Sequence, residues 1–306
     1  MNEPRQSVEL LTTGDWQDYA LLDSGDGMRL ERFGRYTLAR PDPEVLWRKR
    51  LSAADWAKAD ATFQHGSTQS TLPLAGGTEG GRALWTKRRP VPAQWPMRYR
   101  GLTFHARLTP FKHTGVFPEQ AVLWNWMRAT LMQASRETHV LTLFGYTGLA
   151  ALTCASAGAQ VTYVDASKWA MEWARENQRA SGLDDKPVRW LVDDALKFVK
   201  REARRGVRYD AIVLDPPSFG RGPKGEVWKF AEGIQPLLEA CVALLSRQPL
   251  FVLITAYALD VSALTLANVL SDTMGVRGSV RAGELTLVEQ SGGRLLSTAI
   301  VARWCA

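Results

Sequence analysis

The sequence predicts an α/β fold: a mostly parallel seven-stranded sheet that ends in an antiparallel hairpin and is preceded by a small β-rich domain. Three observations predict it. From residue 117 onward, short apolar strands alternate with helical segments, which is typical of a buried parallel sheet. The chain closes with two alternating strands around a Gly-Gly turn. Roughly the first hundred residues are instead rich in Trp, Gly and Pro, with turn clusters between apolar runs.

The composition indicates a globular chain, because 45% hydrophobic residues over 306 positions are enough for a large core. No basic and apolar leader follows Met1, and no apolar run reaches the roughly 20 residues that a membrane span requires. We therefore expect no membrane contact and a cytoplasmic location. Cys154, Cys241 and Cys305 have neither paired nor metal-like spacing, so we expect neither a disulfide framework nor a metal site.

Residues 1–107 are predicted to form the small β-rich domain, a candidate for substrate recognition, with one helix at most. Turn clusters at 23–28 and 75–81 separate its strands, and the proline-rich tract 89–96 is expected to be extended. Residues 102–108 alternate like a strand that leads out of this tract. We find no internal repeat and no sign of a particular oligomeric state.

Residues 108–306 are predicted to form the α/β domain, in which helices and strands follow one another in order. The expected helices span 120–133, 148–157, 169–181, 195–205, 231–245 and 261–274. The expected strands span 140–144, 160–164, 188–192, 211–214, 250–255, 284–289 and 295–303.

Glycines and acidic residues gather where the predicted strands end. The first strand of the domain runs into the turn Gly145-Tyr-Thr-Gly148, which leaves backbone open to a ligand. The acids after the next three strands are Asp165, the pair Asp193 and Asp194, and Asp215. In an open α/β sheet the ligand crevice lies outside these ends, so the acids are expected to converge on one pocket. The structural alternative is that the glycines serve turn geometry and that Asp194, before Ala195, is only a helix N-cap.

The motif Asp215-Pro-Pro-Ser-Phe219 is the sharpest signal in the chain. Two prolines directly after a buried strand stiffen the backbone and expose carbonyls without competing amide donors. Such a loop can accept a hydrogen bond from a target amine and place an aromatic ring against a base. The predicted catalytic residues are therefore Asp215, Pro216, Pro217 and Phe219. The alternative is a plain rigid turn.

Together with Val164-Asp165-Ala-Ser167, Asp194-Ala195 and the segment Lys112-His-Thr-Gly-Val-Phe-Pro-Glu-Gln120, these motifs resemble the large-subunit ribosomal RNA methyltransferase family from about residue 101 to the C-terminus. The resemblance implies a Rossmann-like methyltransferase sheet with S-adenosylmethionine in the crevice, Asp165 on its ribose and Asp194 near its adenine. The cofactor-binding residues that it implies are Thr114, Phe117, Gln120, Phe144, Gly145, Tyr146, Thr147, Gly148, Asp165, Ala166, Ser167, Asp194, Ala195 and Asp215.

The sequence also departs from this family. Members that methylate a cytosine carbon carry a catalytic Cys on the strand after the Asp-Pro-Pro loop, whereas here that strand ends in Ile254-Thr-Ala-Tyr-Ala258. Carbon methylation of a pyrimidine needs a covalent thiolate adduct. We therefore expect ribosomal RNA methylated at a base nitrogen. Because the loop has one residue more than Asn/Asp-Pro-Pro-Tyr/Phe, the target atom stays open.

The segment 82–112 contains eight Lys or Arg and no acid, while the whole chain has a net charge of +7. Aromatic residues interleave with these cations, a combination suited to RNA phosphates and bases. The alternative is a solvated strand face over core aromatics. A second basic cluster, on helix 195–205, is interpreted as a soluble face, the four His as structural, and the loop 220–225 as a lid. The segment contains Arg82, Trp85, Lys87, Arg88, Arg89, Trp95, Arg98, Tyr99, Arg100, Phe104, Arg107, Phe111 and Lys112.

Two other classes of function stay open at this point. A nicotinamide-dependent oxidoreductase would use a similar sheet, but the turn lacks Gly-x-Gly-x-x-Gly and the Pro-Pro loop would have no role. The closing hairpin also favours a methyltransferase, because dehydrogenase sheets usually end on parallel strands. A non-catalytic RNA-binding protein could keep the fold as a scaffold. A methyl-transfer assay would separate it from an enzyme.

Overall fold

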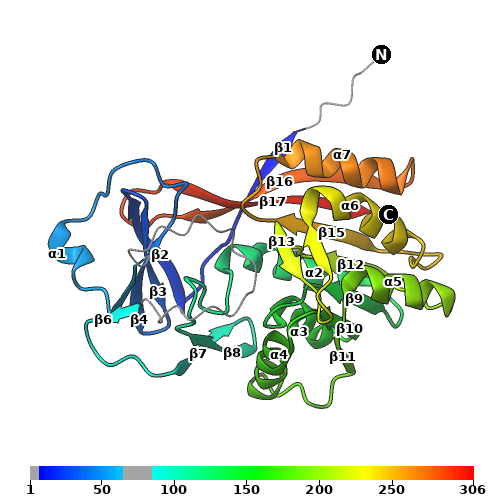
Figure 1. The fold of residues 1–306 in the computed structure, drawn as a ribbon, viewed down its shortest axis with the longest axis horizontal. Coiled ribbons are helices and arrows are strands. Elements are labelled where there is room, and N and C mark those ends of the chain that lie inside the picture. The colour runs from blue at the N-terminus through cyan, green and yellow to red at the C-terminus, as the bar shows by residue number, and fades with distance from the viewer. Residues whose placement is uncertain (1–6, 65–84) are drawn as a thin grey trace.

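The computed structural model describes residues 7–64 and 85–306, which form a β-rich lobe and an α/β lobe (Figure 1). The turn cluster expected at 75–81, together with His65 and Arg82, lies outside the described residues.

The α/β lobe is built on one sheet with the strand order β1-β16-β17-β15-β12-β9-β10-β11. Its middle strands pair in parallel, and β17 pairs antiparallel with both β15 and β16, so the predicted fold class is confirmed. The strands are β9 (His139–Leu143), β10 (Gln160–Asp165), β11 (Val188–Val192), β12 (Ala211–Leu214), β15 (Phe251–Ala256), β16 (Ser279–Val288) and β17 (Leu295–Cys305).

The N-terminal strand β1 (Val8–Thr12) adds an eighth strand to this sheet. It pairs in parallel with β16, with Val8 opposite Ala282. The chain therefore starts on the sheet of the α/β lobe before it enters the β-rich lobe. The strand β1 is short and only partly buried, so its sequence shows no pattern that assigns it to either lobe.

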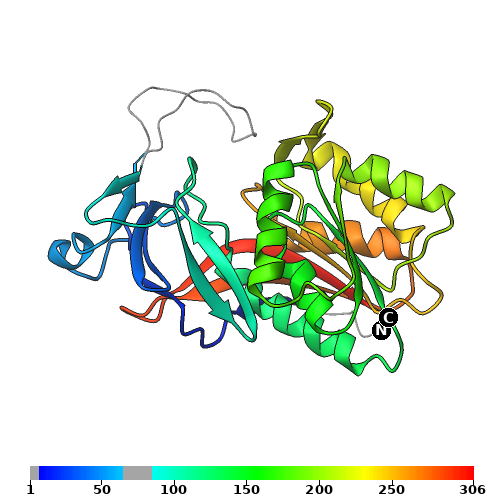
Figure 2. The ribbon, with the colours of Figure 1, turned by 90° about the horizontal axis from the view of Figure 1, so that it is seen from below.

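Helices cover both faces of the sheet, which explains why β12 and β15 are buried along their whole length (Figure 2). Val140 and Leu253 pack toward the first three helices, while Leu141 and Ile254 pack toward the last three. No helix within residues 7–64 and 85–306 is long and apolar enough to cross a membrane. The helices are α2 (Ala121–Gln133), α3 (Leu149–Ser156) and α4 (Lys168–Ala180) on one face, and α5 (Ala195–Arg204), α6 (Phe230–Val242) and α7 (Ala263–Met274) on the other.

The β-rich lobe contains a five-stranded sheet, a hairpin and one short helix. Asp26 and Gly27 form the two-residue turn expected at 23–28, both with positive φ (51° and 72°). The hairpin packs on α4, where the Ser181 hydroxyl donates to the Thr103 carbonyl at 2.7 Å. The elements are β2 (Tyr19–Gly25), β3 (Met28–Phe33), β4 (Tyr36–Pro41), α1 (Ala53–Trp56), β5 (Ala61–Phe63), β6 (Trp85–Lys87), β7 (Gln94–Tyr99) and β8 (Leu102–Arg107).

The basic segment proves to be mostly a core of aromatic rings under a solvated surface. Four of its rings are less than 10% exposed, and the Trp85 indole donates to the Thr109 carbonyl at 2.8 Å. Arg88 and Arg89 both pair with the buried Asp60 carboxylate. The alternative interpretation of this segment therefore holds for these rings and cations, while Phe111 is 46% exposed. The four rings are Trp85, Trp95, Tyr99 and Phe104.

The hairpin β16–β17 extends from the α/β lobe into the β-rich lobe (Figure 1). At its tip, the Glu289 carboxylate is 1% exposed and accepts hydrogen bonds from the Ser24 amide at 3.1 Å and from the Ser24 hydroxyl. The Gln290 amide donates to the Leu21 carbonyl at 2.8 Å. A buried carboxylate with charge-assisted hydrogen bonds thus fixes the two lobes together.

We expect Glu289→Ala to destabilise the protein by about 1–3 kcal/mol, because it leaves the buried Ser24 donors without an acceptor. Urea unfolding measures the change in the free energy of unfolding. The matched control is Glu284→Ala in β16, the strand that leads to Glu289, with an expected cost within about 0.5 kcal/mol. Equal costs for the two variants would show that Glu289 does not join the lobes.

Candidate active site

The turn after β9 is strained backbone held by packing. Phe144, Tyr146 and Gly148 all have positive φ (57°, 46° and 83°), and the Tyr163 hydroxyl donates to the Tyr146 carbonyl at 2.5 Å. A Cβ at Gly145 would lie 2.2 Å from the Tyr163 ring, and a Cβ at Gly148 would lie 2.7 Å from the Cβ of Ala174. Close packing therefore requires the two glycines. This reason differs from the one expected from the sequence, namely that they leave the backbone open to a ligand.

The turn is also tied to the segment that precedes α2. The Thr147 hydroxyl donates to the Gly115 carbonyl at 2.7 Å, and the side-chain amide of Asn177 donates to the Thr147 carbonyl at 2.9 Å. A Cβ at Gly115, where φ is 91°, would lie 2.1 Å from the Trp173 ring. Thr114 is fully buried, and its hydroxyl has no hydrogen-bond partner among the described residues.

Asp165 lies at the end of β10 with its carboxylate beside the turn. One oxygen accepts from the Tyr146 amide and the other from the Ser167 amide, both at 2.8 Å. The residue is partly exposed, and desolvation raises its pKa. Ser167 in turn caps α4 through the Ala170 amide, so Ala166 is held between two fixed residues. The Asp165 carboxylate keeps further lone pairs for a ligand.

Asp215 leaves β12 on the same edge of the sheet. Its carboxylate accepts from the Thr255 hydroxyl and, at 3.3 Å, from the Gln120 side-chain amide. The pKa of Asp215 is raised to about 7. Burial is the largest cause and the negative charges of Glu119 and Asp165 act in the same direction, while the hydrogen bond from Thr255 lowers the pKa. A carboxyl group with this pKa can change its protonation state near neutral pH.

Besides Thr255, two further residues of this cluster were not predicted. The Tyr257 hydroxyl accepts from the Gln120 amide at 3.0 Å and hydrogen-bonds Glu119, while its ring packs on Phe117 with centroids 5.1 Å apart. Glu119 is 3% exposed, and burial raises its pKa. Both could have been found: Tyr257 directly follows the strand β15, and Glu119 stands next to Gln120 in the quoted motif.

Phe117 and Tyr146 form an aromatic wall with Tyr257. The Phe117 ring lies 5.8 Å from that of Tyr146 and 5.3 Å from that of His113. Burial and the nearby cations Arg40 and Lys112 lower the pKa of His113 to about 3. His113 is thus neutral and structural at ordinary pH.

Asp194 and Ala195 are placed differently from the acids above. The Asp194 carboxylate accepts from the Lys197 amide at 2.9 Å and so caps α5, as the structural alternative proposed. Asp193 pairs with Arg201 at 2.6 Å. The structure therefore places Asp165 and Asp215 at the same level on either side of β9 and engages Asp193 and Asp194 with α5.

The loop after Asp215 is only partly available to a substrate. Pro216 is buried and Pro217 is exposed, but the Pro217 carbonyl already accepts from the Trp228 indole at 2.7 Å. Phe219 does not lie in an open loop, because it starts a short hairpin of β13 (Phe219–Arg221) and β14 (Val227–Lys229). The lid expected at 220–225 is the far end of this hairpin.

No cysteine lies at this edge of the sheet. Cys154 and Cys241 are fully buried in α3 and α6, and burial raises the pKa of Cys154 to about 12. Cys305 pairs with Phe251, at the amino end of β15.

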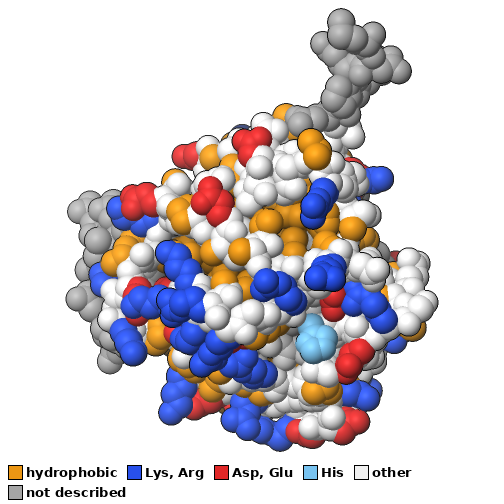
Figure 3. Space-filling model, turned by 90° about the vertical axis from the view of Figure 1, so that its right-hand side faces the viewer, with side chains coloured by type: hydrophobic (Ala, Val, Ile, Leu, Met, Phe, Trp, Pro, Cys, Tyr) orange, Lys and Arg blue, Asp and Glu red, His pale blue; other side chains and the backbone are white. Residues whose placement is uncertain are grey.

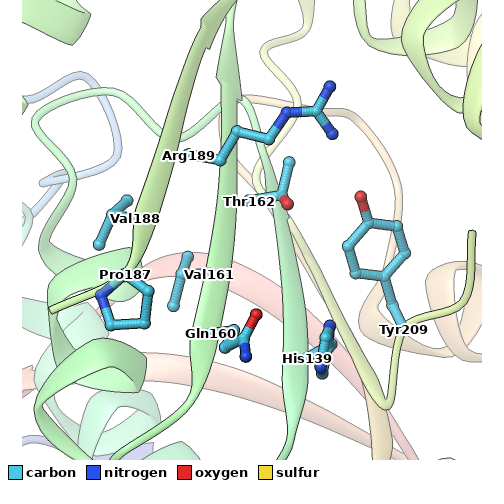
Figure 4. Close-up of a pocket in the computed structure, with 8 residues that line it drawn as sticks. All are labelled: His139, Gln160, Val161, Thr162, Pro187, Val188, Arg189 and Tyr209. Carbon is cyan, nitrogen blue, oxygen red and sulfur yellow. The ribbon is translucent and has the colours of Figure 1, made fainter.

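A cavity of about 330 Å³ lies at the opposite, amino ends of β9, β10 and β11 (Figure 4). His139, Thr162 and Arg189 line it, and the Arg189 guanidinium and the Tyr209 hydroxyl share the buried Glu202 carboxylate, each at 3.0 Å. Arg189, Tyr209 and Glu202 therefore satisfy one another. The cavity is separated from the Asp165–Asp215 edge by the length of the strands.

Lys and Arg side chains gather on the side of the molecule where α5 lies (Figure 3). Several of them are already paired: Arg201 with Asp193, and Arg205 with Glu202 at 3.2 Å. This agrees with the interpretation of a solvated helix face.

Comparison with known proteins links this geometry to one family. The family profile described as S-adenosylmethionine-dependent methyltransferase matches residues 41–242. A solved structure, the SAM-dependent methyltransferase from Agrobacterium tumefaciens, is 40% identical with a TM-score of 0.89. That alignment covers 98% of this chain and 93% of the other.

Two further similarities are more limited. A protein assigned as a methyltransferase and solved in complex with SAH shares the fold, with 18% identity, a TM-score of 0.67 and coverage of 95% and 76%. The ribosomal RNA large subunit methyltransferase K/L of Shewanella sp. is 34% identical over 128 residues. This match covers 41% of the chain but only 17% of that relative, so the chain spans a minor part of its length.

We expect wild-type protein to lose stability as the pH rises from about 4 to about 7, relative to Asp215→Asn. The folded state keeps a proton on Asp215, whose pKa is raised from 3.8 to about 7, whereas the unfolded state releases it. The difference in the free energy of unfolding is at most about 1.4 kcal/mol per pH unit in this window. Urea unfolding at several pH values measures it, and parallel curves for the two proteins would contradict the assignment.

Proposed function

This chain belongs to the S-adenosylmethionine-dependent methyltransferases, and from that premise we propose that it methylates a base nitrogen of ribosomal RNA at the 215–219 loop. The observation that carries the proposal is that Asp165 and Asp215 leave the strands on either side of β9 at one edge of the sheet, where the strained turn after β9 begins. This edge is where open α/β sheets bind ligands.

The residues at this edge fit the cofactor. Asp165 has lone pairs left to accept the ribose hydroxyls, and the buried Thr114 hydroxyl has no partner within the described residues, so it could serve a ligand. S-adenosylmethionine, when bound, supplies a methyl group on a sulfonium leaving group. Phe117, Gln120 and Tyr146 would stand beside it. The Asp194 carboxylate caps α5, and we propose that it also lies near the adenine of the bound cofactor.

The side chains of this chain would act mainly by orientation and exclusion of water. Thr255 and Gln120 hold the Asp215 carboxyl in place, and the two prolines keep the loop rigid. A carboxyl group with a pKa of about 7 can accept a hydrogen bond or a proton from a target amine near neutrality. The absence of a cysteine from the carboxyl ends of the described strands favours nitrogen over a pyrimidine carbon.

The choice of RNA rests on two observations. Curated relatives from Shewanella sp. and Methylococcus capsulatus are ribosomal RNA large subunit methyltransferases, although they are matched over a minor part of their length. Next to the 215–219 loop, the hairpin carries Arg221 and Lys224, which are exposed and have no acidic side-chain partner among the described residues. Cations beside a target loop suit phosphates that flank a target base.

We expect Asp165→Ala to weaken binding of S-adenosylhomocysteine by roughly ten- to a hundredfold, because hydrogen bonds to a charged acceptor contribute about 1.5–3 kcal/mol. Isothermal titration calorimetry measures the affinity. Asp193→Ala is the matched control, since its carboxylate pairs with Arg201 away from the turn. Equal affinities for wild type and Asp165→Ala would refute the ribose assignment.

We expect removal of both hairpin cations, Arg221→Ala with Lys224→Ala, to flatten the salt dependence of RNA binding. Each phosphate contact contributes about 0.7–0.9 to the log–log slope, so the slope should fall by about 1.4–1.8. The measurement is affinity for a large-subunit ribosomal RNA fragment from low to moderate salt. Arg88→Ala with Arg89→Ala is the control, because Asp60 already pairs with both cations. A slope that both double variants leave unchanged would remove the hairpin from the RNA-binding surface.

A further inference from the structure

Trp228 joins the two loops that the reaction needs. Its indole N–H donates to the Pro217 carbonyl at 2.7 Å, in the loop that follows β12. Its ring packs against Phe144, in the turn that follows β9, with ring centroids 5.1 Å apart. The turn and the loop belong to neighbouring strands of the sheet, and the half-buried indole contacts both from β14.

The surroundings of Trp228 leave space for its ring. A Cβ at Gly233, in α6, would lie 2.6 Å from the indole, and a Cβ at Gly220 would lie 3.9 Å from the Cβ of Trp228. Glycine in a helix interior costs about 1 kcal/mol relative to alanine. Gly233 carries this cost, and its missing side chain lets the indole of Trp228 contact the helix directly.

The far end of the hairpin is fastened as well. Lys197 of α5 pairs with Glu226 at 2.6 Å, and the Phe230 amide donates to the Ser218 carbonyl at 3.0 Å. The hairpin is therefore held at both ends, and the indole is the contact that reaches from it to Pro217 and Phe144. A carbonyl next to proline residues has few amide donors nearby, so the indole N–H is a specific partner for it.

We propose that Trp228 is a positioning residue that sets the 215–219 loop relative to the cofactor turn. The indole hydrogen bond fixes the direction of the Pro217 carbonyl, and the ring contact fixes the distance of the loop from Phe144. This rests on the proposed function of that loop as the target loop. Because small misplacements of reacting groups cost large factors in rate, loss of the hydrogen bond should reduce turnover more than binding.

The test uses Trp228→Phe, which keeps a ring against Phe144 but removes the N–H donor. Hydrogen–deuterium exchange of the amides of residues 218–230 should become about two- to tenfold faster, the equivalent of one lost hydrogen bond. S-adenosylhomocysteine affinity should stay within about twofold. With ribosomal RNA from a strain lacking the gene, kcat should fall about tenfold or more, with KM nearly unchanged.

Trp47→Phe is the matched control, because it also removes an indole hydrogen bond to a backbone carbonyl, that of Ser24 at 3.1 Å, in the other lobe. Gly233→Ala is the second variant, since it displaces the indole by its Cβ while Trp228 stays in the chain. It should give the same exchange and kcat changes as Trp228→Phe.

The outcomes separate the two proposals. Exchange and turnover in Trp228→Phe that match Trp47→Phe would overturn the positioning role. If wild type transfers no methyl group to ribosomal RNA, the proposed substrate fails, while the exchange of residues 218–230 still decides the role of Trp228. A loss of S-adenosylhomocysteine affinity equal to the loss of kcat would show a general effect on the cofactor turn, which also contradicts the proposal.

Discussion

The parallel pairing of β9 with both of its neighbours is the constraint on which the site depends. Leu143, the last residue of β9, lies opposite Val164 of β10 on one side and Leu214 of β12 on the other. The residues that follow these three therefore lie at the same level, at the carboxyl edge of the sheet. Phe144 starts the strained turn, while Asp165 and Asp215 place their carboxyl groups beside it. A shift in register by one residue would turn each side chain to the other face of the sheet.

The same edge contains strained backbone and buried carboxyl groups, which destabilise the fold and must be offset by packing elsewhere. Three of the five non-glycine residues with positive φ in the described chain lie here: Phe144, Tyr146 and Ala258. Glu119 and Asp215 are carboxyl groups whose pKa burial raises, so their charged forms are destabilised in the folded protein. Strain and desolvated acids are typical of sites prepared for a ligand or a reaction, because packing holds them in place. The long apolar strands and two helical layers supply that packing.

Much of this could be predicted from the sequence, because it depends on local patterns. Apolar runs and helical periodicity placed the strands and helices of the α/β lobe within a few residues, and the strand-end rule found Asp165 and Asp215. Tertiary contacts decided the rest. The aromatic rings of the basic segment became core, and β1 paired with the sheet of the α/β lobe. The Asp194 cap, by contrast, is a local contact and was one of the two roles considered from the sequence. Trp228 carried no signal, because its role depends on a hairpin that brings it back to Pro217.

We propose that the protein transfers a methyl group to a base nitrogen of ribosomal RNA at the Asp215 loop. The most direct measurement is mass-spectrometric mapping of methylated nucleotides in ribosomal RNA from a strain lacking the gene, complemented with wild type or Asp215→Ala. In the strain lacking the gene, a large-subunit nucleotide should lose a methyl group on a base nitrogen, which wild type should restore and the variant should not. An unchanged methylation pattern, or a lost methyl group on a ring carbon, would contradict the proposal.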